Sequence, residues 1–250
     1  TTEIYTLSLH DALPICVRYD VPSVCSALLH AGEVDLGLIP SVEYLQRPDY
    51  RLVPGVGIGS CGPVASVALF TRRPIASVRR IALDTSSRTS VALVKVLCRY
   101  RFRIEPEFVP HGPDLHVMTQ DSDAALLIGD PALEVEHRTM GLDKIDLGEE
   151  WTAMTGLPFV YAAWTGRPGA IRDDDVRALQ QAQLEGVTAT EAIAAEYGGN
   201  DPAATARAAA YLRHNVRYAL GPEEARGLQT FLDYAAETGL APHARTLEFF

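Results

Sequence analysis

Short apolar runs alternate with segments of helical spacing through most of the chain. Runs bounded by Gly, Pro or polar residues predict strands at 34–39, 52–58, 64–70, 78–83, 107–109, 124–128 and 158–164. Apolar positions three and four apart predict helices at 24–31, 87–100, 173–197, 203–218 and 222–237, and further helices begin at Ser41 and within 146–151. This alternation is typical of an α/β protein with a mostly parallel sheet.

One break in the pattern suggests a boundary inside the chain. Arg72-Arg73-Pro74 interrupts an apolar run and is the first candidate for a border between two α/β units. The strand expected at 158–164 runs back out of the second unit and leads into a region that is helical from Asp173 onward. The chain therefore reads as two α/β units followed by helices.

Composition and charge narrow the function classes. The 250 residues are 47% hydrophobic with a net charge of −10, which fits a globular protein without a basic surface for nucleic acid. No apolar run of about eighteen residues could span a membrane, and no secretion signal is visible. The four cysteines form no C-x-x-C pair and the histidines form no metal motif, so we expect reduced thiols, no metal and a cytoplasmic protein.

The most informative segment is the turn at 84–90, Asp-Thr-Ser-Ser-Arg-Thr-Ser, between an expected strand and an expected helix. The first turn of a helix has unpaired N–H groups and the positive end of the dipole, which attract an anion. The hydroxyl groups of Ser86, Ser87 and Thr89 would add donors, and Arg88 would add positive charge. The alternative is an ordinary N-cap, which needs only one such residue. We expect an anion to bind here.

Polar residues follow several of the predicted strands. Ser41, Ser60, Ser86 and Asp130 each come directly after or at the end of a strand-like run. In open α/β sheets ligands bind beyond the carboxyl ends of the strands, so these four residues are candidates for one site. The alternative for each residue is a polar loop position without a ligand.

Five segments carry motifs of one family: 34–44, 60–67, 84–90, 123–133 and 146–160. Together, and in this order, they resemble the chorismate dehydratase family of the futalosine route to menaquinone. The resemblance runs from about Val17 to the last helix. It implies an α/β, two-lobed, type II periplasmic-binding-protein-like fold with a ligand cleft between the lobes. Lobe one would be discontinuous, formed by 1–73 and 165–250, and lobe two would comprise 74–164.

The resemblance also implies a lyase that removes water from chorismate and forms 3-[(1-carboxyvinyl)oxy]benzoate. Loss of water makes the ring aromatic, so we expect a protein that holds a dianion in a dry cleft and uses no cofactor. The implied residues are Ser86 and Asp130 for catalysis, and Ser41, Ser60, Gly62, Ser87, Arg88, Thr89 and Gly129 for substrate binding. The base that takes the ring proton could be a carboxylate of the substrate, Asp130 or another group.

Three other functions fit the same pattern. A solute-binding protein would share the fold, as would the sister enzyme 1,4-dihydroxy-6-naphthoate synthase, which we expect to differ at the turn 86–90. The ligand-sensing domain of a regulator ranks last, because the chain has no helix-turn-helix segment and no basic charge. We expect the small-molecule substrate as partner, with no nucleic acid and no membrane. No feature of the sequence specifies an oligomeric state.

Residues 1–15 depart from the family pattern. Family members open with a strand and an Asn-x-x-Pro-Leu loop whose Asn faces the cleft, and this chain has no such loop. The segment instead resembles translated adapter DNA joined to a truncated reading frame. We therefore expect the chain as given to be poorly active and less stable than a family member.

Overall fold

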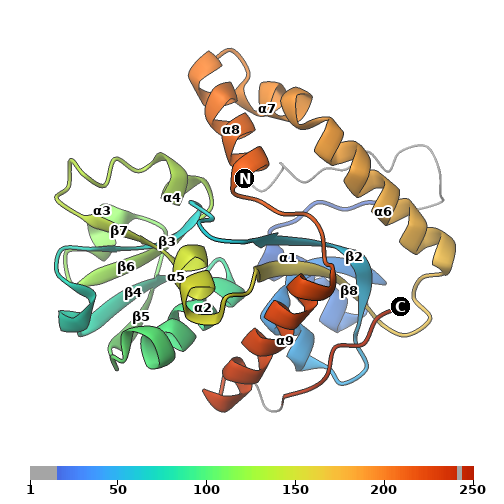
Figure 1. Cartoon of the computed structure of the whole chain (residues 1–250), viewed down its shortest axis with the longest axis horizontal. Helices are drawn as coiled ribbons and strands as arrows, with labels where there is room; N and C mark the ends of the chain where they lie inside the picture. The colour runs from blue at the N-terminus through green and yellow to red at the C-terminus, as the bar shows by residue number, and fades with distance from the viewer. Residues whose placement is uncertain (1–15, 241–243) are drawn as a thin grey trace.

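Two β-sheets organise the molecule in a computed structural model that describes residues 16–240 and 244–250 (Figure 1). The expectation about residues 1–15 lies outside the described residues. The strands are β1 (Leu36–Pro40), β2 (Arg51–Ser60), β3 (Val67–Thr71), β4 (Arg80–Asp84), β5 (Glu107–His111), β6 (Ala124–Ile128), β7 (Asp143–Asp146) and β8 (Phe159–Gly166).

Helices surround and connect the sheets. The α-helices are α1 (Pro22–Ala31), α2 (Arg88–Leu97), α3 (Leu115–Met118), α4 (Asp130–Glu134), α5 (Leu147–Thr155), α6 (Asp173–Thr188), α7 (Thr190–Gly198), α8 (Pro202–His214) and α9 (Pro222–Glu237). Shorter turns are η2 (Ser41–Gln46), η3 (Ile75–Ser77) and the π-helical η4 (Cys98–Phe102). In Figure 1 the helices α7 and α8 lie at the top of the molecule, and α6 descends from them along the upper right, on the side of the first sheet.

The first sheet has the order β1-β8-β2, and β8 pairs antiparallel with both neighbours. Because β8 follows every strand of the second sheet in the sequence, this half of the molecule is built from both ends of the described chain. Phe249 makes a parallel bridge to Leu52 of β2, which joins the C-terminal segment to the same half.

The second sheet has the order β5-β4-β6-β3-β7. β4 pairs in parallel with β5 and β6, whereas β3 pairs antiparallel with β6 and β7. All five residues of β3 are buried, because this strand lies inside the sheet. The parallel strands β4 and β6 end on the same edge, where α2 and α4 begin.

One expectation about the sheets is corrected. The described strands do not form a mostly parallel sheet, since every pairing in the first sheet and two of the four in the second are antiparallel. The lobe borders expected at 73 and 165 stay a prediction, and the strands of the two sheets lie on either side of slightly earlier segments. β3 belongs to the second sheet and β8 to the first, so the chain crosses between sheets at 61–66 and 156–158. We call these segments the first and second crossover.

The expected helices occur with shifted ends. The segment expected as one helix at 173–197 is divided into α6 and α7, and the helix expected at 203–218 ends at His214 as α8. α9 spans the expected 222–237, and α1 ends before Gly32, whose φ of 79° is the left-handed conformation that glycine adopts easily. Local capping residues therefore predicted the end of α1 and both ends of α9, but not the break between α6 and α7.

An aromatic cluster lies where the two sheets meet. Trp151 of α5, Phe159 of β8 and Phe231 of α9 are fully buried and pack edge to face, with ring centroids 4.8–6.1 Å apart. The Trp151 indole N–H donates to the carbonyl oxygen of Pro158 at 3.1 Å, so the cluster also holds the second crossover. Side chains of both sheets share the hydrophobic core that includes these rings.

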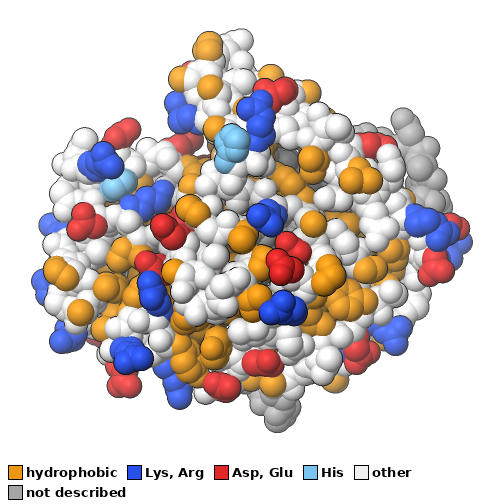
Figure 2. Space-filling view, in the orientation of Figure 1, with side chains coloured by type: hydrophobic (Ala, Val, Ile, Leu, Met, Phe, Trp, Pro, Cys, Tyr) orange, Lys and Arg blue, Asp and Glu red, His pale blue; other side chains and the backbone are white. Residues whose placement is uncertain are grey.

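The surface carries mixed charge. Figure 2 shows acidic and basic side chains interspersed on the visible face, with apolar side chains between them. Among the described residues, no helix is long and apolar enough to cross a membrane.

Candidate functional site

The carboxylate of Asp146 organises the first crossover. It is the N-cap of α5 and its Oδ1 accepts hydrogen bonds from the N–H groups of Gly148 and Glu149 at 2.9 and 3.1 Å. It also accepts from the N–H groups of Val64 at 3.1 Å and Ala65 at 2.6 Å. One side chain therefore fixes the crossover to the start of α5 with four hydrogen bonds.

Lys144 of β7 also binds the first crossover. Its ammonium group donates to the carbonyl oxygens of Ala65 at 2.7 Å and Ala132 at 2.9 Å. Burial lowers the pKa of Lys144, and the nearby Asp146 carboxylate partly opposes that shift. The first crossover and helix α4 are thus tied to one another through β7.

Thr152 of α5 joins the two crossovers. Its Oγ1 accepts from the N–H of Gly62 at 2.9 Å, and its hydroxyl donates to the carbonyl oxygen of Leu157 at 3.3 Å. The two segments that connect the sheets therefore meet on one side chain.

Ser60 and Gly62 contact each other beside Tyr161. Ser60 is fully buried, and its Oγ lies 3.3 Å from the carbonyl oxygen of Gly62 and 3.3 Å from the Tyr161 hydroxyl. Gly148 leaves the space for this group, because a Cβ there would lie 2.7 Å from the Tyr161 hydroxyl and 2.8 Å from Ser60 Oγ. Burial raises the pKa of Tyr161 well above its usual value, so the phenol stays neutral.

The hydroxyl-rich turn starts α2 as an N-cap. The Ser87 side chain accepts from the N–H of Ser90 at 3.2 Å, which confirms the N-cap interpretation for Ser87. Ser86 is exposed, and its N–H and hydroxyl both donate to Oδ1 of Asp84, at 3.0 and 2.7 Å. The remaining N–H groups of the first turn have no partner within the helix. Anion binding at this turn stays a prediction.

Ser41 and Thr89 meet between η2 and α2, which belong to opposite halves. Both are buried, and their Oγ atoms lie 3.4 Å apart. The Ser41 hydroxyl donates to the carbonyl oxygen of Val160 at 2.7 Å, and Thr89 Oγ1 accepts from the N–H of Val42 at 3.3 Å. These two expected ligand residues therefore help to connect the halves.

Arg88 pairs with a carboxylate that the sequence analysis did not single out. Its Nη1 lies 2.8 Å from Oε2 of Glu43, whose side chain is only 3% exposed. His30 Nε2 lies 2.8 Å from the same oxygen, and His30 Nδ1 lies 2.7 Å from the Tyr50 hydroxyl. Glu43 is thus a buried acid held by one cation and one imidazole from two different helices.

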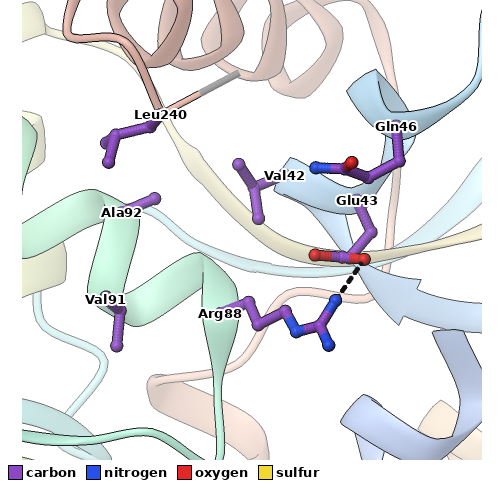
Figure 3. Close-up of a pocket in the computed structure, with 7 residues that line it drawn as sticks. All are labelled: Val42, Glu43, Gln46, Arg88, Val91, Ala92 and Leu240. Atoms are coloured by element: carbon purple, nitrogen blue, oxygen red, sulfur yellow. Dashed lines mark hydrogen bonds and ion pairs between the residues drawn. The ribbon is translucent and has the colours of Figure 1, made fainter. Parts of the chain in front are cut away.

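An open pocket of about 260 Å³ lies along this contact. Figure 3 shows the Arg88–Glu43 pair on its floor, with Gln46 from η2 on one side and apolar side chains opposite. The lining residues are Val42, Glu43, Gln46, Arg88, Val91, Ala92 and Leu240.

Gly129 and Asp130 form the start of α4, at the same edge of the second sheet as the start of α2. Gly129 has a φ of 65°, and its N–H donates to the carbonyl oxygen of Ser66 at 2.8 Å. Asp130 forms a side-chain hydrogen bond with Tyr197 of α7. Burial raises the pKa of Tyr197 to about 12, and the charge and the hydrogen bond of Asp130 contribute to the same shift. Ser66 in turn lies 2.9 Å from the hydroxyl of Tyr211 in α8, so the α7–α8 pair covers this edge.

The expected site residues therefore fall into three groups. Ser41 contacts Thr89 beside the α2 turn, Ser60 contacts Gly62 at the first crossover, and Gly129 precedes Asp130 at α4. Among the described residues, no hydrogen bond joins one group to another, and no group of three or more His, Cys, Asp or Glu side chains could hold a metal. The sequence analysis did not identify Glu43, Asp146 or Tyr161 as residues of the site. The N-cap position of Asp146 before Leu147-Gly148 was the one sequence signal for them.

The architecture is that of a periplasmic-binding-protein-like protein. Protein AF1704 from Archaeoglobus fulgidus is 21% identical, with a TM-score of 0.67, over 90% of this chain and 86% of that chain. The periplasmic aliphatic sulphonate binding protein SsuA from Escherichia coli is 19% identical, with a TM-score of 0.57, over 91% and 78%. The Candida albicans CA3427 gene product, which has the generic periplasmic binding protein fold, is 11% identical, with a TM-score of 0.59, over 92% and 81%. These likenesses establish the fold.

Sequence comparison identifies the family. A family model described as menaquinone biosynthesis matches residues 3–237. The chorismate dehydratase of Thermus thermophilus is 32% identical over 244 residues, which cover 87% of this chain and 85% of that protein. This chain belongs to the menaquinone biosynthesis family. The family match begins at residue 3, earlier than the start near Val17 expected from the motifs, and so includes most of 1–15.

Proposed function

We propose that this protein is a chorismate dehydratase, a lyase that converts chorismate to 3-[(1-carboxyvinyl)oxy]benzoate and water in the futalosine route. The observation that carries the proposal is the 32% identity to the Thermus thermophilus enzyme across 85% of its length. The two-sheet architecture supports it, because small-molecule sites occur preferentially where two domains or lobes meet.

The ligand would lie between two lobes, one for each sheet. The start of α2 favours an anion through its N–H groups and dipole, and the first crossover lines the same junction. The substrate-binding residues in this proposal remain Ser41, Ser60, Gly62, Ser87, Arg88, Thr89 and Gly129. Three of these residues also connect parts of the fold: Ser41 and Thr89 join η2 to α2, and Arg88 is paired with Glu43.

The proposed reaction requires few groups from the protein. A base takes the proton from one ring carbon, the electron pair of that C–H bond becomes a ring double bond, and the neighbouring hydroxyl leaves as hydroxide. Hydroxide and a proton form the product water, and the ring becomes aromatic. The protein aligns the breaking bonds and stabilises the departing oxygen. Ser86 and Asp130 are our proposed catalytic residues: Ser86 would align the leaving hydroxyl, and N–H groups of the cleft would stabilise the departing oxygen. The base is a substrate carboxylate, Asp130 or another group.

We place the reaction in the cytoplasm. The cysteines at 16, 25, 61 and 98 are all free thiols in the structure, which is the state expected in a reducing compartment.

The test is to incubate the purified protein with chorismate and to follow the aromatic product by ultraviolet absorbance and mass spectrometry. Product formation that scales with protein concentration is expected, and a heat-denatured sample is the control. Binding of chorismate without any product would contradict the proposal and would indicate a solute-binding protein of the same fold.

A further inference from the structure

Ser86 is exposed, and its hydroxyl proton already takes part in a hydrogen bond. Both of its donors, the N–H and the hydroxyl, are directed to Oδ1 of Asp84, at 3.0 and 2.7 Å. A serine hydroxyl has one proton and two acceptor lone pairs. As long as Asp84 holds that proton, exposed Ser86 can offer only lone pairs to a ligand.

Asp84 is an unusual residue to find beneath a turn that is expected to bind an anion. It is 1% exposed, and its Oδ2 is buried without a hydrogen-bond partner. Among the described residues it forms no ion pair. Buried carboxylate oxygens are nearly always bonded, and an unpaired one is costly in free energy. Ser86 is therefore the residue that meets the hydrogen-bonding capacity of Asp84 among the described residues.

We propose that Asp84 is a positioning residue that keeps Ser86 as a hydrogen-bond acceptor, so that the turn selects ligands with a hydroxyl group. The turn would then bind two different groups of one ligand. The N–H groups at the start of α2 receive a carboxylate, and Ser86 receives an alcohol O–H. A site built to bond a hydroxyl discriminates strongly against an analogue without it, because its own polar group is left unpaired.

Given the proposed function, on which this inference rests, the alcohol is the ring hydroxyl that chorismate loses. The ligand class is a hydroxylated cyclohexadiene dicarboxylate. The product has no ring hydroxyl, so the same contact would favour the substrate over the product and assist product release.

Two unreactive ligands test this. One is the dihydro analogue of chorismate, in which loss of water no longer gives an aromatic ring, and the other is the same compound without its ring hydroxyl. Calorimetry should show that the protein prefers the hydroxylated analogue by about ten- to a hundredfold. Ser86→Ala, at an exposed position, should remove that preference.

Asp84→Asn should reduce the preference, and it should have no further effect in the Ser86→Ala background, because Asp84 acts through Ser86. Asp123→Asn is the matched control. Asp123, like Asp84, accepts two hydrogen bonds at one oxygen, here from the backbone N–H groups of Arg79 and Arg80, but it lies at the opposite end of β4. Its variant should therefore keep the full preference. Melting curves of all variants confirm folding, and Asp84→Ser takes the place of Asp84→Asn, with the same expected result, if that variant does not fold.

The outcomes separate the two proposals. Equal affinity of the unaltered protein for both analogues would overturn the role of Asp84 alone. An undiminished preference in Asp84→Asn would also overturn it, as would an equal loss with and without Ser86. Failure to bind either analogue, with no turnover of chorismate, would overturn the proposed function and this inference together.

Discussion

Asp146 and Asp84 occupy matching places in the second sheet, and their surroundings differ. Each ends a strand and precedes a helix that packs at the junction of the two sheets. Asp146 accepts four backbone N–H groups and connects the first crossover to α5. Asp84 accepts two donors, both from Ser86, and keeps one oxygen without a partner.

The difference separates a carboxylate that stabilises the fold from one that prepares a site. A satisfied carboxylate contributes to folding through bonds that already exist. A buried oxygen without a partner weakens the fold, and in our proposal Asp84 instead acts on the ligand through Ser86. The same substitution should therefore cost more stability at Asp146 than at Asp84.

Asp146→Ala should have the largest effect. It removes a helix N-cap and the acceptor for two crossover N–H groups, so the free energy of unfolding should fall by about 3 kcal/mol. Asp146→Asn keeps one acceptor oxygen and should lose less. Urea denaturation followed by circular dichroism measures both. An Asp146→Ala protein as stable as its parent would show that the crossover does not depend on this side chain.

Ser86→Ala should mainly affect function. Loss of a hydrogen bond involving a charged partner is worth about 1.5–3 kcal/mol, which lowers kcat/KM for chorismate about ten- to a hundredfold. The residue is exposed, so the melting temperature should change little. Ser77→Ala, at another exposed serine far from the turn, is the control. Unchanged kinetics in Ser86→Ala would assign the turn a capping role only.

Gly148→Ala tests the close packing at the crossover. The new Cβ would lie within 2.8 Å of the Tyr161 hydroxyl, Ser60 Oγ and the Gly62 carbonyl oxygen, so we expect a loss of about 1–3 kcal/mol in stability together with lower turnover. Gly112→Ala is the matched control, because no atom lies within 4 Å of a Cβ there. Equal melting temperatures for the two variants would argue against a packed crossover.

Asp84→Asn should have the smallest effect on stability. The amide oxygen can still accept from Ser86, and a neutral group replaces the unpaired carboxylate oxygen, so the free energy of unfolding should stay within about 1 kcal/mol of the parent. The comparison with Asp146→Asn is direct when both are measured in the same urea series. A larger loss in Asp84→Asn than in Asp146→Asn would reverse the roles assigned to the two carboxylates.

Local sequence determined the helices and their caps. The Pro at the start of α9, the Gly after α1 and the serine that caps α2 act over one turn of chain, so their effect can be read from neighbouring residues. The apolar runs likewise marked each strand among the described residues except β7. The motifs were also sufficient for the family, since they depend on the order of residues alone.

Tertiary structure decided the sheet pairing and most of the site. An apolar run such as β3 is equally suited to either sheet, and only its neighbours β6 and β7 assign it to the second. Glu43 and Arg88 are 45 residues apart and Asp146 and Val64 are 82 apart, so no local pattern indicates that either pair meets. Polar contacts of this kind depend on distances that are set once the sheets pack together. The sequence by itself determined which residues could bind a ligand, and the packing decided which of their donors and acceptors are still available.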